Sequence, residues 1–323
     1  MAVQWKSMLG GAGVAALLII PAAADNNGGW ITWPWRSYQV NDVKIDSVVG
    51  HLRVEVKPQA QVGVQVSGRK ARLDHITVRQ SGNTLIIEGE NRNSVWDWSN
   101  WFDFSSHENS TKDVDVHVVV PKGTALDVED MVGDAAIGDT EGDLHFEAVD
   151  SNATIGHVRE AHLDMAGAGK IDVARIDGDL HLSVAGSGRI RTGSARAVHA
   201  DIAGSGTASL GQIRELHLDI AGSGDFSAQR VDGPVKVDIM GAGSVNIKDG
   251  VADPLHLDIA GAGNFVFGGE AVDPHISAFG SGSVKLRSYR GKLSTDGMAD
   301  VKIGPDGFPA APAAPPAPPV KPK

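Results

Sequence analysis

One short phrase recurs over more than half of the chain, and it limits the possible folds more than any other feature. The phrase reads L-H-L-D-I-A-G-S-G at residues 216–224 and returns with small changes every 18 to 20 residues. Weaker copies at residues 126–138 and 144–156, and a partial copy from residue 293, bring the number of units to about ten. Such self-similarity predicts a repeat protein whose units stack on one another. The first glycine of the closing triplet falls at Gly167, Gly186, Gly204, Gly222, Gly241, Gly261 and Gly280.

Within each unit, apolar and polar residues alternate with a period of two, which indicates β-strands and not helices. Leu255, Leu257 and Ile259 share one face of their segment, while His256 and Asp258 take the other. One unit is too small to bury its own apolar row, so successive units must stack at the strand spacing of about 4.8 Å. We therefore predict an all-β fold with an N-terminal β cap. Its body is a right-handed parallel β-helix, a β-solenoid of about ten coils with about 19 residues each.

The composition along the chain predicts four segments. Residues 1–24 combine Lys6, a short apolar run and a final A-x-A site, which is typical of a secretory signal peptide cleaved after Ala24. Residues 25–120 form an N-terminal β segment with a Trp-rich cap, and residues 121–305 form the solenoid. Residues 306–323, rich in Pro and Ala, form a disordered, extended tail. We expect an exported protein of the periplasm, cell surface or medium, with no transmembrane segment in its mature chain.

Charge and cysteine content exclude several classes of function. The chain has 40 Asp and Glu against 29 Lys and Arg, a net charge of −11, whereas a nucleic-acid-binding protein needs a basic surface. It contains no Cys, so disulfides, thiolate metal sites and cysteine nucleophiles are excluded. The motifs H-E-x-x-H, G-x-S-x-G and the P-loop are also missing from the sequence, so we expect no catalytic residues.

The alternating pattern extends upstream of the repeats. It reads V-K-I and G-H-L-R-V-E-V within residues 43–56, V-G-V-Q-V-S-G at residues 62–68, G-N-T-L-I-I at residues 82–87 and V-V-V-P at residues 118–121. Together with the repeated I-A-G-[SA]-G, this pattern resembles the head GIN domain family, a domain of unknown function also named putative auto-transporter adhesin. The likeness covers roughly residues 40–305 and implies a secreted or envelope β-solenoid. It carries no catalytic residue over to this chain.

The strongest chemical pattern is a row of histidines followed, two residues on, by a row of acids. Residues i and i+2 of a strand share a face, so both rows should point outward together. Imidazole suits Zn, Cu or Ni, and a stacked row of imidazoles would also respond to pH. The alternative is that repeat duplication copied a tolerated surface residue. The metal-ligand candidates are His162, Asp164, His181, His199, Asp201, His217, Asp219, His256 and Asp258.

Six tryptophans follow the signal segment, in two clusters outside the repeats. Trp30, Trp33 and Trp35 form the first cluster, and the second contains Trp96, Trp98 and Trp101. Exposed indole rings of the second cluster could bind glycans, and we name these three as candidate ligand-binding residues. The competing interpretation is that the rings cover the open end of the solenoid.

These patterns favour a non-enzymatic, adhesin-like interaction module of the bacterial envelope, with an unidentified envelope protein or polysaccharide as its partner. No cofactor is expected. Two alternatives stay open. The first is a periplasmic metal-binding or pH-responsive protein that uses the His/Asp rows. The second is a polysaccharide-active β-helix enzyme, because paired carboxylates on a solenoid can cleave glycosidic bonds.

Overall fold

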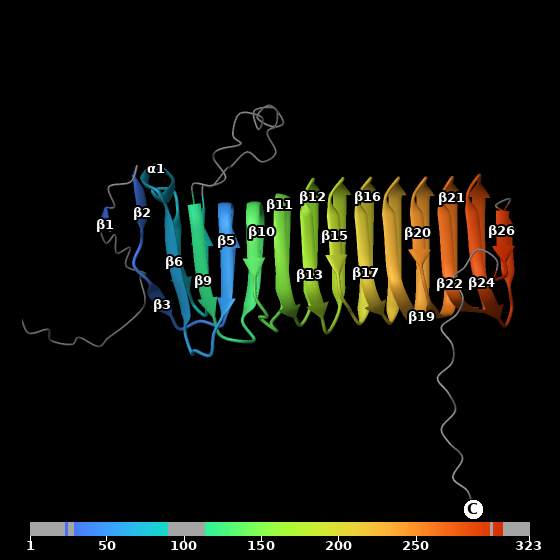
Figure 1. The fold of residues 1–323 in the computed structure, drawn as a ribbon, viewed down its shortest axis with the longest axis horizontal. Helices are drawn as coiled ribbons and strands as arrows, with labels where there is room; N and C mark the ends of the chain where they lie inside the picture. Colours follow the sequence, from blue (N-terminus) through green and yellow to red (C-terminus); the bar gives the residue numbers. More distant parts are fainter. Residues whose placement is uncertain (1–22, 25–28, 90–113, 298–299, 306–323) are drawn as a thin grey trace, which may run out of the picture. The chain divides into compact units, whose positions relative to one another are not determined.

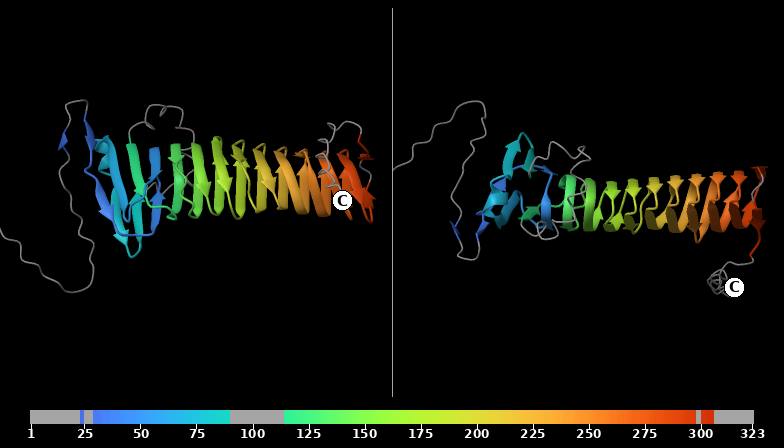
Figure 2. Two further views of the ribbon diagram at one scale, coloured as in Figure 1. Left: turned by 60° about the horizontal axis from the view of Figure 1, so that its bottom comes forward. Right: turned by 90° about the horizontal axis from the view of Figure 1, so that it is seen from above.

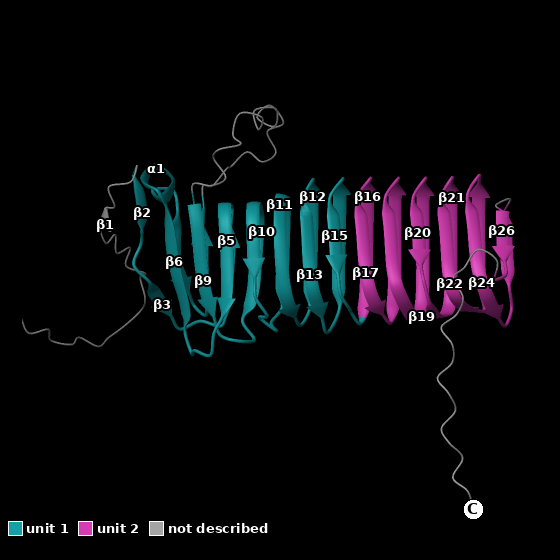
Figure 3. Ribbon diagram, in the orientation of Figure 1, with its two compact units in different colours: residues 1–196 teal, residues 197–323 magenta. Residues whose placement is uncertain are grey.

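The computed structural model of the chain describes residues 23–24, 29–89, 114–297 and 300–305 (Figure 1). It is almost entirely β-structure, and its stacked coils make a β-solenoid of about nine turns, which confirms the predicted fold class. The chain divides into two compact units, unit 1 (Met1–Arg196) and unit 2 (Ala197–Lys323), shown in teal and magenta in Figure 3. In the described part of the chain, no helix has the length and apolar character needed to cross a bilayer.

The second Trp cluster, the Pro/Ala-rich segment 306–323 and residues 1–22 of the expected signal peptide lie outside the described residues.

Unit 1 contains one short helix, α1 (Lys70–Leu73), and fifteen described strands. Its N-terminal strands are β1 (Ala23–Ala24), β2 (Trp30–Thr32), β3 (Arg36–Tyr38), β4 (Asp42–Asp46), β5 (Val49–Val56), β6 (Val62–Arg69), β7 (Thr77–Ser81), β8 (Thr84–Glu88) and β9 (Val114–Val120). The strands of its repeats are β10 (Ala125–Ile137), β11 (Leu144–Val158), β12 (Ala161–Gly167), β13 (Lys170–Ile176), β14 (Leu180–Gly186) and β15 (Arg189–Thr192).

The repeats of unit 1 pair in parallel and in register with the repeated phrase. β12 runs beside β14 from the pair Ala161–Leu180 to the pair Gly167–Gly186, so equivalent letters of the phrase are neighbours. The longer β11 pairs with β12 through its first half and with β13 through its second half, because the chain turns a corner between the two halves. The views in Figures 1 and 2 show the coils side by side within the unit.

The N-terminal segment of unit 1 is not simply added in front of the repeats. β4 and β5 form a coil between two later segments: they pair in parallel with β10 on one side and with β8 and β9 on the other. The strand β9 directly precedes β10 in the sequence, yet its neighbours are β5 and, antiparallel, β6. The order β6, β9, β5, β10 is visible in Figure 1.

Among the described strands of unit 1, the antiparallel pairs lie in the N-terminal segment. β2 and β3 pair with β6, and β7 forms a hairpin with β8. The first Trp cluster lies here: Trp30 belongs to β2, and the half-exposed ring of Trp35 packs edge-on against His117 with ring centres 5.0 Å apart. The ring of Trp35 thus packs on the N-terminal segment, and the end-covering role of the first cluster stays a prediction.

Unit 2 repeats the two-strand coil with little variation. Its strands are β16 (Ala197–Gly204), β17 (Thr207–Ile213), β18 (Glu215–Gly222), β19 (Asp225–Gly241), β20 (Ser244–Ile247), β21 (Gly250–Gly261), β22 (Asn264–Val272), β23 (His275–Gly280), β24 (Ser283–Arg290), β25 (Ser294–Gly297) and β26 (Asp300–Ile303). Parallel pairs link the first strand of each coil to the first strand of the next, and the second to the second. Each coil thus adds one strand to each of two parallel β-sheets.

The core of each unit consists of the side chains on the inward faces of its β-sheets. In unit 2 the side chains of Phe226, Val245, Phe265 and Val284 occupy one register position in successive coils, and each is at most 1% exposed. Burying one such side chain stabilises the fold by about 1.5–3 kcal/mol. The stacking of equivalent apolar residues explains why the sequence keeps a strict period of two along each strand.

Candidate functional site

The outward face of unit 1 carries the first part of the predicted histidine row. Parallel pairing puts His145 of β11 beside His162 of β12, and His162 beside His181 of β14. The centres of the first two rings are 5.0 Å apart, and the rings of His162 and His181 are stacked at 5.6 Å. In the acidic row, Glu147 lies beside Asp164. Both rows therefore exist as in-register neighbours on one face of this unit, as the repeat predicted.

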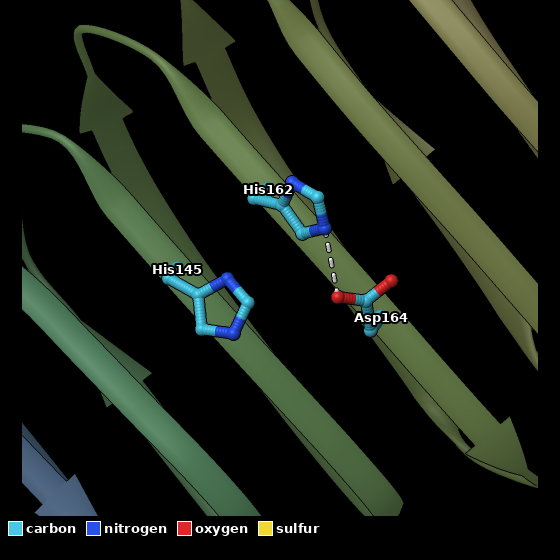
Figure 4. Close-up of side chains that lie close together, drawn as sticks. All are labelled: His145, His162 and Asp164. Atoms are coloured by element: carbon cyan, nitrogen blue, oxygen red, sulfur yellow. Dashed lines mark ion pairs between the residues drawn. The ribbon is translucent and has the colours of Figure 1, made fainter.

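Three of these side chains form a compact group (Figure 4). Nε2 of His162 lies 3.0 Å from an oxygen of Asp164, and His145 lies beside them on the adjacent strand. One donor atom from each of His145, His162 and Asp164 falls within 4.8 Å of the other two. The side chain of His162 is 50% exposed and that of Asp164 is 30% exposed, so a solvated ion can reach both.

The row continues into strands that the repeat analysis did not include among the candidates. Asp127 of β10 lies beside His145, and Lys44 of β4 lies beside Asp127. The ammonium of Lys44 is 3.3 Å from Asp127 and 2.5 Å from Glu129. Partial burial lowers the pKa of Lys44, but the ion pairs with Glu129 and Asp127 outweigh this effect and raise the pKa. Lys44 is therefore positively charged at neutral pH. Asp127, Glu129 and His145 form a second group of three donor atoms, which Lys44 already neutralises in part.

Sequence reasoning missed Asp127 and Glu129, although a signal was present. The run Leu126-Asp127-Val128-Glu129 occupies the place of L-H-L-D in the weak copy at residues 126–138, with acids replacing the histidine and the aspartate. The contact with Lys44 has no such local signal, because 83 residues separate it from Asp127.

A β-bulge beside this group concentrates negative charge. Val128 pairs with Phe146 and Met131 with Ala148, so Glu129 and Asp130 together stand opposite the single residue Glu147. Asp130 adopts a left-handed backbone conformation, with φ at 50°. Burial raises the pKa of the Asp130 carboxyl, and the charges of Asp46 and Glu129 raise it further. Burial likewise raises the pKa of Glu147, and Asp130 and Asp164 outweigh the opposing effect of His145.

Two of the three residues in Figure 4, His145 and His162, line an open groove of unit 1. The groove has a volume of about 780 Å³, and its walls include Lys44, Asp127, His145, His162 and His181. Its walls combine imidazoles, carboxylates and one ammonium with apolar side chains, which suits a small cation or a polar segment of a larger ligand better than an apolar molecule.

Unit 2 carries its own pair of rows. His199, His217, Lys236, His256 and His275 are neighbours in one row, and Asp201, Asp219, Asp238, Asp258 and Ser277 are neighbours in the other. Two groups of three donor atoms form here, and they share Asp219: His199 with Asp201 and Asp219, and His217 with Asp219 and Asp238.

The ammonium of Lys236 lies within the second of these groups. Nζ of Lys236 lies 2.9 Å from Asp238 and 3.4 Å from Nε2 of His217. The hydrogen bond and the charge of Asp238 raise the pKa of Lys236, so the ammonium already supplies a cation at this place. The distances from histidine to the acid two residues on are 3.6 Å for His199 and Asp201, and 3.3 Å for His217 and Asp219.

The structure brings some predicted site residues together and leaves others apart. His162 with Asp164, His199 with Asp201, and His217 with Asp219 each take part in a three-donor group. Among the described residues, the three-donor groups do not include His181, His256 or Asp258. The acidic row is interrupted beside two of these residues, where Ser183 follows His181 and where Ser277 lies beside Asp258. Trp96, Trp98 and Trp101 lie outside the described residues, so their predicted role in ligand binding stays a prediction.

The comparisons with known proteins begin with a family model. Residues 44–250 match the model of a family described as "Putative auto-transporter adhesin, head GIN domain". No curated protein matches the chain.

Solved structures similar to the chain include two bacterial putative adhesins and one putative lipid binding protein. A putative adhesin from Bacteroides fragilis is 18% identical, with 86% of this chain and 98% of that chain covered and a TM-score of 0.39. A putative adhesin from Parabacteroides distasonis is 15% identical, with the same coverage and a TM-score of 0.45. A putative lipid binding protein from the same organism is 16% identical, with 86% and 97% covered and a TM-score of 0.36.

Proposed function

We propose, since the chain belongs to the head GIN domain family, that it is an adhesin-like, non-enzymatic module of the bacterial envelope that binds a partner on its outward solenoid face. One observation carries this proposal: the matched residues 44–250 contain most of the residues that line the groove of unit 1, and the outward rows as far as Asp238. The partner is an envelope protein or a polysaccharide, and the segment 1–24 directs the chain out of the cytoplasm.

The face is suited to binding because it is regular and rigid. Parallel strands hold neighbouring outward side chains about 4.8 Å apart, and side chains that project from a hydrogen-bonded sheet are more exactly placed than those on loops. Imidazole groups donate and accept hydrogen bonds and carboxylates accept them, which matches the hydroxyl-rich surface of a polysaccharide or the polar surface of an envelope protein.

The enzymatic alternative rests on paired carboxylates. Glu147 and Asp164 are neighbours on adjacent strands, and the pKa of Glu147 is raised by burial, then by the charges of Asp130 and Asp164. A pair of this kind can serve as acid and base in glycoside hydrolysis. The family description of adhesins favours binding over hydrolysis, so a binding module is the function we put forward.

Localisation is the test of this proposal. Intact cells of the native bacterium would be treated with protease, and the protein followed by immunoblot against a periplasmic marker and a known surface protein. An adhesin-like module that contacts partners outside the cell is cleaved on intact cells while the periplasmic marker survives. Protection until the outer membrane is opened would contradict adhesion and leave an interaction within the periplasm.

A deletion strain completes the test. Loss of the protein is expected to reduce attachment of the cells to a polysaccharide-coated surface, and expression of the full chain from a plasmid should restore attachment. Unchanged attachment of a strain whose protein is surface-exposed would contradict a role as an adhesin.

A further inference from the structure

We propose that His145, His162 and Asp164 of unit 1 form a binding site for one divalent transition-metal cation of the Zn²⁺, Ni²⁺ or Cu²⁺ class. This inference goes beyond the proposed adhesin-like function and is independent of it. Two imidazoles and one carboxylate are the ligands that such cations prefer, and three protein ligands leave a position for water or for a group of a bound partner.

The distances within the group are close to those of a coordinated ion. Zinc bonds to nitrogen and oxygen ligands are about 2.0–2.2 Å long, so tetrahedral ligand atoms are roughly 3.3 Å apart. Nε2 of His162 and Oδ2 of Asp164 are already 3.0 Å apart. The donor atom of His145 lies within 4.8 Å of both, and rotation of its side chain brings it the remaining distance of roughly 1.5 Å.

The backbone places these ligands without a loop. His145 and His162 are directly paired residues of β11 and β12, and Asp164 follows His162 on the same face. Two hydrogen-bonded strands hold the Cα positions of a site more exactly than flexible segments do, which lowers the entropy lost when a cation binds.

Charge around the group also favours a cation. The carboxylates of Asp127, Glu129, Asp130, Glu147 and Asp164 gather on β10, β11 and β12 around these two histidines, and Lys44 pairs with the first two of them. The remaining negative charge attracts divalent cations toward His145 and His162, which also line the open groove.

The other groups of three donors fit a transition metal less well. The group of His217, Asp219 and Asp238 already holds the ammonium of Lys236, and the group of His199, Asp201 and Asp219 offers only one imidazole. The group in unit 1 with Asp127 and Glu129 also offers one imidazole and holds Lys44. The group of His145, His162 and Asp164 thus offers two imidazoles and one carboxylate. The ion-pair partner of that carboxylate is His162, which is itself one of the proposed ligands.

Calorimetric titration with ZnCl₂ tests the site on the purified protein after treatment with EDTA and dialysis. We expect saturable binding, and a loss of affinity of at least about tenfold in His162→Asn, His145→Asn or Asp164→Asn. Mg²⁺, which prefers oxygen ligands, is expected to bind at least about tenfold more weakly than Zn²⁺. Thermal unfolding in EDTA checks that each variant is folded.

His256→Asn is the matched control. His256 is also an outward histidine with an aspartate two residues on, but it lies outside the three-donor groups of the described chain. We expect its zinc affinity to stay within about twofold of the unmodified protein, since a discrete site does not depend on a histidine that is not one of its ligands. The proposal is overturned if zinc does not bind, if His162→Asn leaves binding unchanged, or if His256→Asn weakens binding as much as His162→Asn does.

Discussion

The first glycine of each closing triplet is required by the backbone and by the neighbouring coil together. Gly222 has φ at 122°, a region that residues with a side chain rarely adopt, and a Cβ at this position would lie 2.6 Å from the carbonyl oxygen of Gly204 in the preceding coil. The glycine row therefore follows from the close approach of stacked turns as well as from the turn itself.

Gly222→Ala should lower the free energy of unfolding of the protein by about 2–3 kcal/mol, because strain at φ and the clash with Gly204 add together. Gly82 offers a control: its φ is 59°, but a Cβ there would meet nothing within 4 Å. Gly82→Ala should cost only about 1 kcal/mol. Urea unfolding followed by circular dichroism measures both, and equal losses would show that the contact between coils does not matter.

Asp130 is a second residue whose environment predicts a measurable effect. Because its folded-state pKa is raised by burial and by Asp46 and Glu129, the ionised carboxylate opposes folding at neutral pH. The folded state binds this proton more tightly than the unfolded state, so the penalty is present above the folded-state pKa and disappears as the pH falls below the ordinary value of 3.8.

Asp130→Asn should therefore raise the thermal midpoint at pH 7 by about 1–3 °C, and the gain should vanish near pH 3. Asn tolerates the left-handed backbone at this position, so the substitution tests charge without changing the bulge. Thermal scans of both proteins across this pH range decide the matter. A gain that stays constant with pH would mean that charge is not its cause.

At the scale of elements, the repeat makes one coil equivalent to the next. β16 and β18 pair over eight consecutive positions that end with Gly204 beside Gly222. Removal of residues 205–222 would therefore join Gly204 to Ser223, which restores the same local sequence, A-G-S-G. The inward and outward faces keep their places, because one whole coil is lost.

The 18-residue deletion of 205–222 should leave a folded protein with a cooperative transition and a thermal midpoint within about 5 °C of the full chain. Deletion of residues 205–213 is the control, since it removes half a coil and an odd number of residues, which turns apolar side chains outward. Circular dichroism and thermal unfolding compare the two. The stacking argument fails if both deletions damage the fold equally.

Elements outside the repeat were harder to predict. The alternation at residues 43–56 identified strands, but the position of β4 between β8 and β10, and of β5 between β9 and β10, depends on pairing between distant segments. A period-two pattern predicts which face of its strand a residue occupies. It does not predict which strand lies next to that strand. The bulge at Glu129 and Asp130 is likewise set by the pairing of β10 with β11.

At the scale of the whole molecule, the net charge of −11 disfavours association with nucleic acids and favours association with cations. The excess of acids does not by itself locate a site, because most carboxylates on the surface are simply hydrated or paired. Lys44 and Lys236 are examples, because each forms ion pairs with acids of a row. The sequence pattern alone does not distinguish these paired acids from the other acids of the rows. The site proposed in unit 1 is distinguished by Asp164, whose ion-pair partner among the described residues is His162.

The sequence alone determined the strand period, the glycine turns, the stacking of coils and the outward rows of His and Asp, because each of these is a local pattern repeated every 18 to 20 residues. The tertiary structure alone decided which members of the rows form a group. The repeat register already predicted His145 beside His162, and Asp164 lies two residues further along the same strand, whereas the place of Lys44 beside Asp127 depends on which strands pair. Strand pairing joins segments up to 83 residues apart, and its outcome is set by the packing of the whole core, which no local pattern contains.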